Sequence, residues 1–510
     1  MADSRTHRAK LNIISSLGCQ FITLICGLIV PRMLIGAFGS EMYGATTSIA
    51  QFLGYITLLE GGIGGVARAA LYKPLAENDI QKISQVVSEI KRFFRKIAYI
   101  FIAYVIVLAC SFKYISKMYD MGWWFTFGLV IVISLSTFAQ YFIGASYSAL
   151  LQASQKTYIT SVISTLTTIL NTILIVLLIS LNCNLLLVKF VSALVFILKP
   201  IFMWLYVRKT VGLERIIITN SKVLRDKWTG MGQHIAYYLH SHTDVVVLTI
   251  FTNLTWVAIY SVYSMVVKHI ENLVSSFTSG MEALFGDMIA KNEKKELSKT
   301  FNFYETFISL LSTVLLSITA VMIIPFVKIY TSGITDANYS QPLLAFLLVV
   351  ISLLFCLRKP YYSMIIAAGH FKETKMAAYG EAIINISLSI FLVHFYGIIG
   401  VTVATVIATL FRFIYYVFYL KKYILKRKLQ KFFKRLIVNF GGFFGVFGIG
   451  NLILKWIHID NYLEWFIGAI VISVLAISFI GGLNLVFYKR EFVLILSRIK
   501  FKLKTRRLKQ

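Results

Sequence analysis

Long apolar runs separated by short polar connections follow one another along most of the chain. A membrane-spanning helix needs about 20 mainly apolar residues, whereas transmembrane β-strands give alternating segments of about ten. Runs such as 167–181 and 343–357 are continuously apolar, which favours helices. The pattern predicts an all-α polytopic membrane protein with about fourteen transmembrane helices, at 11–36, 43–67, 93–119, 122–150, 157–181, 184–207, 231–253, 256–287, 302–331, 339–367, 374–396, 398–420, 432–454 and 461–487.

The composition supports a membrane protein and excludes an ordinary soluble enzyme. Hydrophobic residues make up 58% of the chain and charged residues 14%, against about 45–50% and about 25% in soluble proteins. The five cysteines lie in apolar stretches, their number is odd and no CxxC occurs. They indicate small buried side chains, with neither a disulfide framework nor a metal site.

Basic residues exceed acidic ones, 51 to 22, for a net charge of +29. Such an excess often indicates nucleic-acid binding, but here the basic residues cluster between the apolar runs. If the N-terminus is cytoplasmic, 42 Lys and Arg fall in inner connections and tails and 5 at outer ends. Cytoplasmic loops carry such an excess of Lys and Arg. The charge pattern therefore predicts two cytoplasmic termini and no nucleic-acid partner.

A weak internal repeat relates the two halves of the chain. Tyr147–Ser154 resembles Tyr362–Gly369 at an offset of 215, and the intramembrane cations Lys199 and Arg412 differ by 213. Internal repeats are common in transporters, with the substrate site at the repeat interface. We expect two pseudo-symmetric six-helix lobes, 1–210 and 211–425, followed by an appended helix pair and basic tail, 426–510. Lobes of this kind can rock about a central cleft that opens alternately to each side.

Four stretches carry a resemblance to a known family. They are Pro31-Arg32-Met33-Leu34-Ile35-Gly36 with Glu41-Met42-Tyr43-Gly44, Glu60-Gly61-Gly62-Ile63-Gly64 through Arg68, Asp244 with Val257-Ala258-Ile259-Tyr260-Ser261, and the paired endings Leu151-Gln152-Ala153 and Ala367-Ala368-Gly369. In order and spacing, the chain resembles the oligosaccharide (O-antigen and exopolysaccharide) flippases of the polysaccharide transport family. That family belongs to the multidrug/oligosaccharidyl-lipid/polysaccharide exporter (MOP) superfamily. Glu60 stands where relatives often carry Asp, and a Gly is missing beside Val257, which leaves details of the cavity open.

The resemblance implies a MATE-like fold and a transporter without catalytic residues or cofactor. It implies flipping of an undecaprenyl-diphosphate-linked oligosaccharide from the cytoplasmic to the outer leaflet, for cell-surface polysaccharide assembly. The expected location is the bacterial cytoplasmic (inner) membrane, and the expected partners are membrane lipids and other polysaccharide-assembly membrane proteins. A proton or sodium ion is the candidate for coupling.

Charged residues inside the predicted spans are the candidate site, because a charge at the bilayer centre costs at least about 2.5–3.5 kcal/mol. Arginine and lysine suit a diphosphate, through bidentate hydrogen bonds and a point charge respectively. The candidate substrate-binding residues of a cationic cleft are Arg32, Arg68, Lys199, Lys268, Arg358 and Arg412. The candidates for a coupling ion or a charge pair are Glu60, Asp244 and Glu271.

Simpler interpretations of these residues stay open. Lys268 and Glu271, three apart on a helix, can neutralise each other, and Arg68 and Arg358 can reach the cytoplasmic headgroups. Four tyrosines can bind sugar rings or simply pack, namely Tyr237, Tyr238, Tyr260 and Tyr263. A metal at His240, His242 and Asp244 is disfavoured, because helix positions two apart point about 200° away from each other.

Two other functions compete with a flippase. A drug/cation antiporter of the same superfamily is expected to have an acidic cavity and usually twelve helices, whereas the intramembrane excess here is basic. A membrane-embedded polysaccharide polymerase or glycosyltransferase is expected to have a large outer loop or an acidic catalytic motif, and the sequence shows neither.

Overall fold

The computed structural model describes the whole chain except residues 1, 61–62, 215–230, 279, 426 and 490–510, and it does not describe the side chains of 2–6, 9, 231–237 and 239–241. About 88% of it is helical, with no strand among the described residues. The expected all-α fold is confirmed. By its internal contacts the chain divides into two compact units, Met1–Ile259 and Tyr260–Gln510. The division reflects which residues contact one another and does not test a sequence repeat, so the repeat boundary near residue 210 stays a prediction.

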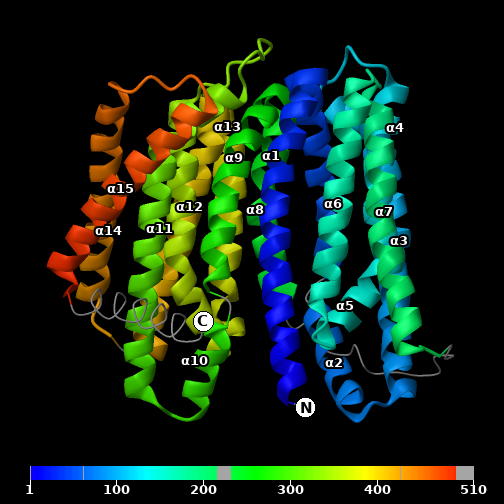
Figure 1. Cartoon of the computed structure of the whole chain (residues 1–510), viewed down its shortest axis with the longest axis horizontal. Helices are drawn as coiled ribbons and strands as arrows, with labels where there is room; N and C mark the ends of the chain where they lie inside the picture. Colours follow the sequence, from blue (N-terminus) through cyan, green and yellow to red (C-terminus); the bar gives the residue numbers. More distant parts are fainter. Residues whose placement is uncertain (1, 61–62, 215–230, 279, 426, 490–510) are drawn as a thin grey trace. The chain divides into compact units, whose positions relative to one another are not determined.

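The first unit is built on long helices that follow the predicted apolar runs (Figure 1). They are α1 (Ala2–Gly54), the 3-10 segment η1 (Tyr55–Glu60), α2 (Ile63–Glu77), α3 (Ile80–Ile115), α4 (Trp123–Ala139), the π-helical turn η2 (Gln140–Gly144), α5 (Ala145–Ala153), α6 (Thr157–Ser180), α7 (Leu185–Val211), α8 (Met231–Phe251) and the start of α9 (Leu254–Ser276). Helix α1 packs along α6, and α4 packs between α3 and α7. Asp79 caps α3 by accepting from the Lys82 backbone N–H, and this hydrogen bond lowers the pKa of Asp79.

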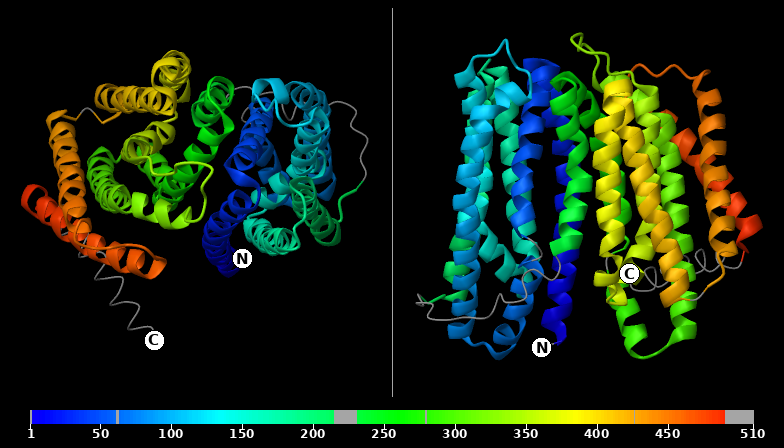
Figure 2. Two further views of the ribbon diagram at one scale, coloured as in Figure 1. Left: turned by 90° about the horizontal axis from the view of Figure 1, so that it is seen from above. Right: turned by 180° about the vertical axis from the view of Figure 1, so that it is seen from behind.

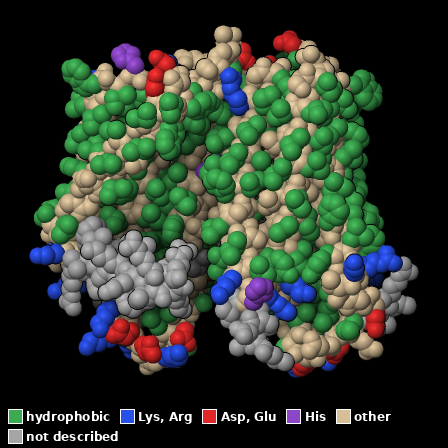
Figure 3. Space-filling model, viewed as in Figure 1, with side chains coloured by type: hydrophobic (Ala, Val, Ile, Leu, Met, Phe, Trp, Pro, Cys, Tyr) green, Lys and Arg blue, Asp and Glu red, His purple; other side chains and the backbone are tan. Residues whose placement is uncertain are grey.

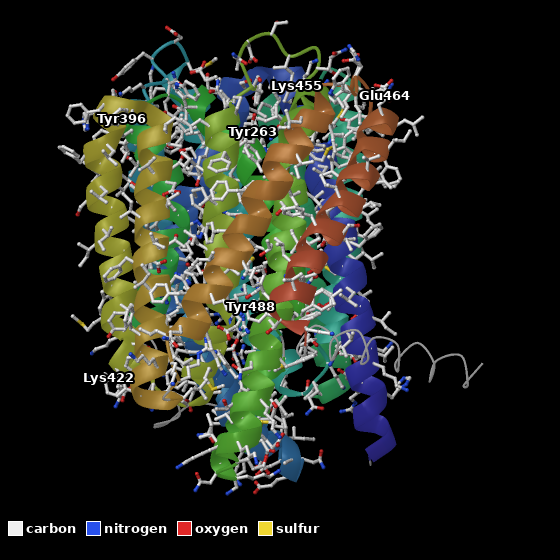
Figure 4. All side chains as sticks on the ribbon, turned by 90° about the vertical axis from the view of Figure 1, so that its left-hand side faces the viewer. Tyr263, Tyr396, Lys422, Lys455, Glu464 and Tyr488 are labelled. Carbon is white, nitrogen blue, oxygen red and sulfur yellow. The ribbon has the colours of Figure 1, made fainter. Side chains whose placement is uncertain are left out.

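The second unit contains the rest of α9 and the helices that follow it. They are α10 (Met281–Ala290), α11 (Lys294–Tyr330), α12 (Pro342–Ala367), α13 (Phe371–Tyr419), the π-helical turn η3 (Leu420–Ile424), α14 (Gln430–Leu454) and α15 (Tyr462–Phe487). Helix α12 packs against α10, α11 and α13, and the pair α14–α15 packs along α11 at one edge of the unit (Figure 2). Lys455 and Glu464 lie at one end of the unit and Lys422 at the other (Figure 4).

Ten helical stretches among the described residues are long and apolar enough to cross a membrane. Two of them, Lys10–Glu60 and Phe371–Ile424, each cover two predicted spans, because the chain kinks at Gly39 and Gly397 without leaving the helix. The two predicted spans outside these ten stretches, 231–253 and 256–287, begin with α8 and α9 respectively. On the face seen in Figure 3, hydrophobic side chains cover the middle of the helices and charged ones gather toward their ends. The chain is a multi-pass membrane protein.

Three predicted spans are interrupted where the sequence pattern suggested continuous helices. The run 43–67 changes to the 3-10 segment η1 and then to α2, and the run 122–150 contains the π-helical turn η2. The run 256–287 breaks between α9 and α10, where Gly280 adopts φ of +89°. Glycine takes such a conformation without the steric cost that a side chain imposes. Hydropathy alone does not reveal these interruptions, because apolar residues continue on both sides of the few polar and glycine positions at which the helices break.

Candidate functional site

Arg358 and Arg412 meet at a single carboxylate, that of Glu381 on α13. Arg358 Nη1 on α12 lies 2.5 Å from Glu381 Oε1, and Arg412 on the second half of α13 pairs with Oε2. The three side chains are buried, with exposed fractions of 5% for Arg358, 3% for Arg412 and 0% for Glu381. Arg412 Nε also donates to the Tyr416 hydroxyl at 2.8 Å. We call these four residues the Glu381 cluster.

A second cluster of the same composition lies where α13 gives way to α14. Arg427 donates to both carboxylate oxygens of Glu305 on α11, at 2.6 and 2.5 Å. Arg435 on α14 and the Tyr361 hydroxyl on α12 contact the same carboxylate. We call these four residues the Glu305 cluster. Arg435 also lies over the ring of Tyr488, whose position is marked in Figure 4, at 5.2 Å. Both clusters hold two arginines for each glutamate, so each has a formal excess of one positive charge.

The α12 face that carries neither cluster is polar as well. Ser352, Lys359 and Ser363 recur at spacings of seven and four residues, which places them on one face of the helix. Ser352 Oγ lies 2.7 Å from Glu271 Oε1 of α9, and Ser363 Oγ lies 3.5 Å from Glu282 Oε1 of α10.

Two lysines complete this arrangement. Lys268 on α9 is exposed and Lys359 is half-buried, with its ammonium over the Phe355 ring at 4.6 Å. Both lie within electrostatic range of Glu271. No ion pair joins either lysine to a carboxylate in the part of the chain that the structure describes. We call Lys268, Glu271, Glu282 and Lys359 the charged ladder.

In the first unit, Glu60 lies where two irregular segments meet. It ends the 3-10 segment η1, and its Oε1 accepts a 2.5 Å hydrogen bond from the hydroxyl of Tyr141. Tyr141 lies on the π-helical turn η2. Such π-helical turns occur often at functional sites. Broken membrane helices are tolerated where their backbone is buried in protein or lines a water-filled cavity.

Aromatic and polar side chains gather beside η1. His242 Nδ1 on α8 contacts the Gln51 amide oxygen, and its ring stacks on that of Tyr238 with centroids 3.9 Å apart. Tyr55 meets Tyr238 edge to face at 5.7 Å. Asp244, 5% exposed, lies within electrostatic range of Tyr55. The side chains of Tyr237 and His240 lie outside the described residues.

The other predicted substrate-binding cations in the first unit lie on three different helices. Arg68 Nη1 on α2 donates to Gln152 Oε1 of α5 at 2.7 Å. Arg32, half-buried on α1, lies with its Nη1 3.9 Å from the place that a Cβ on Gly36 would take. Lys199 is half-buried on α7, next to Pro200, which packs against Gly144 of η2. Whether any of them contacts a substrate stays a prediction.

The structure also reveals charged residues that the predicted site left out. Glu381, Glu305, Glu282 and Lys359 each lie in a predicted span or in the helix that continues it. The rule that selected the other candidates, a charge inside an apolar run, applies to Glu381, Glu305 and Lys359 as well. What the sequence does not reveal is which charges share a partner.

Similarity to known proteins is visible in the fold and not in the sequence. No protein-family profile matches the chain, and no curated protein matches it significantly. Among solved structures, the lipid II flippase MurJ in an inward closed conformation matches 94% of this chain and 99% of its own, with a TM-score of 0.66 and 16% identity. An inward-facing MATE family multidrug resistance transporter of the MOP superfamily matches 80% of this chain and 98% of its own, with a TM-score of 0.59 and 14% identity.

A third structure, a MOP superfamily transporter from Pyrococcus furiosus, is described as having a binding pocket of reverse polarity. It matches 83% of this chain and 97% of its own, with a TM-score of 0.59 and 13% identity. Across these comparisons the chain shares the fold of MurJ and of the MATE transporters, which confirms the expected MATE-like fold. At identities this low, the likeness establishes the fold alone.

Proposed function

We propose that the protein flips an undecaprenyl-diphosphate-linked oligosaccharide from the cytoplasmic to the outer leaflet of the bacterial cytoplasmic membrane. It acts by alternating access, with both termini in the cytoplasm, and supplies a cell-surface polysaccharide assembly line. It works with membrane lipids and other assembly proteins of that membrane. No bond is made or broken in this step, so the protein acts as a transporter and not as an enzyme.

The observation that carries the proposal is the extent of the fold match. The lipid II flippase corresponds to 94% of this chain, against 80% for the inward-facing MATE transporter. The pair α14–α15 follows the helices of the two six-helix lobes that the repeat predicts. A match that takes in nearly the whole chain supports a lipid flippase over a drug transporter.

The charges inside the helices support an anionic substrate. Both the Glu381 cluster and the Glu305 cluster carry two arginines for one glutamate. A buried positive excess attracts an anion and repels a cationic drug. An inside-negative membrane potential also favours outward movement of a negative charge, by about 2.3 kcal/mol per charge per 100 mV.

A drug/cation antiporter is the second candidate, and the MATE folds among the matches favour it. Glu60, joined to Tyr141 at the interrupted span, is the carboxylate best placed to bind a cation in that case. In the flippase the same residue is a candidate for binding a coupling proton or sodium ion, as are Asp244 and Glu271.

Native mass spectrometry of the purified protein tests the choice between these two substrates. The protein is offered undecaprenyl-diphosphate N-acetylglucosamine and a lipophilic cationic drug, ethidium, in competition. We expect the lipid diphosphate to be retained and ethidium to be lost. Preferential retention of ethidium would contradict the flippase and favour the drug/cation antiporter.

A further inference from the structure

The intramembrane charges of the second unit fall into two kinds. The Glu381 carboxylate is paired with two arginines, and the Glu305 carboxylate with two arginines and the Tyr361 hydroxyl. All of these side chains are buried except Arg427, which is half-buried. In the charged ladder each carboxylate has a serine hydroxyl near one oxygen, and each lysine lacks a direct ion pair within the described part of the chain. Carboxylates that are fully paired with arginines hold helices together, whereas the groups of the charged ladder can still form hydrogen bonds with a ligand.

The ladder runs along the axis of α12, on two parallel strips of helix. Glu271 lies opposite Ser352 and Glu282 opposite Ser363, and both pairs are 81 residues apart in sequence. This constant separation shows that the α9–α10 segment and α12 run in the same direction. Ser352 and Ser363 are eleven residues apart on α12, a rise of about 16 Å. Lys359 lies between them.

The signs of the ladder alternate along this length. In order, the groups are Lys268, Glu271, Lys359 and Glu282, and Lys359 is in electrostatic range of both carboxylates. The formal charge of the four groups is zero, unlike that of the Glu381 and Glu305 clusters. The two carboxylates would repel a diphosphate, so the ladder suits a different part of an amphiphilic anion.

The surroundings of the ladder must be polar. An unpaired charge against lipid tails costs about 2.5–3.5 kcal/mol or more, so charges in membrane spans face water or a polar partner. Between α9 and α10 the helix is also interrupted, at the level of Lys359, with Gly280 in a left-handed conformation. Discontinuous helices of this kind form substrate sites in transporters.

From these observations we propose that the charged ladder binds the glycan of the lipid-linked substrate, with Lys359 and Glu271 as contact residues. This inference rests on the proposed function and assigns the polyhydroxylated part of that substrate to the α9–α10 and α12 face. Lysine donates hydrogen bonds to sugar hydroxyls and a carboxylate accepts them. A row of alternating donors and acceptors satisfies several hydroxyls in succession without requiring a net charge on the ligand. Ser352, through its contact with Glu271 Oε1, is a positioning residue.

The test measures how transport depends on the glycan. Proteoliposomes receive three fluorescent carriers, namely undecaprenyl diphosphate, its N-acetylglucosamine conjugate and the lipid-linked oligosaccharide extracted from host cells. For Lys359→Gln we expect KM for the oligosaccharide carrier to rise about tenfold, the effect of losing a hydrogen bond to a charged group. KM for bare undecaprenyl diphosphate should not change. Lys359→Arg, which keeps the positive charge, should leave KM for the oligosaccharide carrier close to the wild-type value.

The matched control is Lys372→Gln, which removes an exposed lysine at the start of α13 and should leave all three carriers unaffected. A thermal melting curve checks the fold of each variant, and Lys359→Met, which keeps the length of the side chain without its charge, serves if Lys359→Gln fails to fold. Equal effects on all three carriers, or no effect on any, would overturn the glycan assignment and leave the flippase intact. If the wild type moves none of the carriers, the proposed function itself fails.

Discussion

Removal of Glu381 should destabilise the protein more than removal of Arg412, one of the two arginines that it binds. Glu381→Gln leaves Arg358 and Arg412, 5% and 3% exposed, without a counter-charge. Breaking a buried ion pair by removal of one partner costs about 3–5 kcal/mol. Arg412→Gln instead leaves Glu381 with Arg358, a neutral pair at 2.5 Å. Its cost should be closer to that of a hydrogen bond to a charged group, about 1.5–3 kcal/mol.

The measurement is equilibrium unfolding of the purified variants by dodecyl sulfate in mixed micelles. The double variant Glu381→Gln with Arg412→Gln should be more stable than the sum of the single effects indicates. Contacting residues commonly show coupling energies of about 0.5–3 kcal/mol. Tyr416→Phe, which removes only the hydroxyl that Arg412 Nε contacts, serves as the mild control. An equal loss of unfolding free energy in Arg412→Gln and Glu381→Gln, or no loss in either, would contradict the role of Glu381 as the shared counter-charge.

Other substitutions test the fold in the same unfolding assay. Gly44→Ala should destabilise strongly, because its Cβ would lie 1.9 Å from the Leu254 carbonyl oxygen, and overpacking costs about 1–3 kcal/mol or more. Gly448→Ala is the matched control, with nothing within 4 Å of the new methyl group, and it should be neutral or stabilising by up to about 1 kcal/mol; equal losses for the two would contradict the close approach. Tyr141→Phe should cost about 1.5–3 kcal/mol through the lost hydrogen bond to Glu60, and an unchanged unfolding curve would argue against that bond.

Much of the fold follows from the sequence because the membrane imposes a simple length rule. The runs 157–181, 184–207, 339–367 and 461–487 correspond closely to α6, α7, α12 and α15. The interruptions were not predictable from hydropathy, since η1 and η2 contain the same apolar residue types as the helices around them. The cause lies in local backbone geometry and in partners such as Glu60 and Tyr141, which are 81 residues apart.

The candidate site was predictable as a set of charges but not as a set of contacts. The sequence predicts substrate binding for Arg358 and Arg412, and the structure shows both paired with Glu381, which no local pattern connects to either of them. Glu305 and Arg427 lie 122 residues apart, so no local pattern reveals their pairing. The local pairing of Lys268 with Glu271 was open, and Glu271 is instead hydrogen-bonded by Ser352 of a different helix. Contacts between helices depend on how the bundle packs, and spacing within one helix does not specify that packing.

Transbilayer movement of the lipid-linked oligosaccharide is the most direct test of the proposed function. A labelled undecaprenyl-diphosphate oligosaccharide is placed in one leaflet of proteoliposomes, and a membrane-impermeant glycosidase reports how much reaches the other leaflet. A flippase should give protein-dependent exposure of the label, at a rate well above that of protein-free vesicles, in the same preparation that fails to transport ethidium. Equal exposure with and without the protein, together with transport of ethidium, would contradict it.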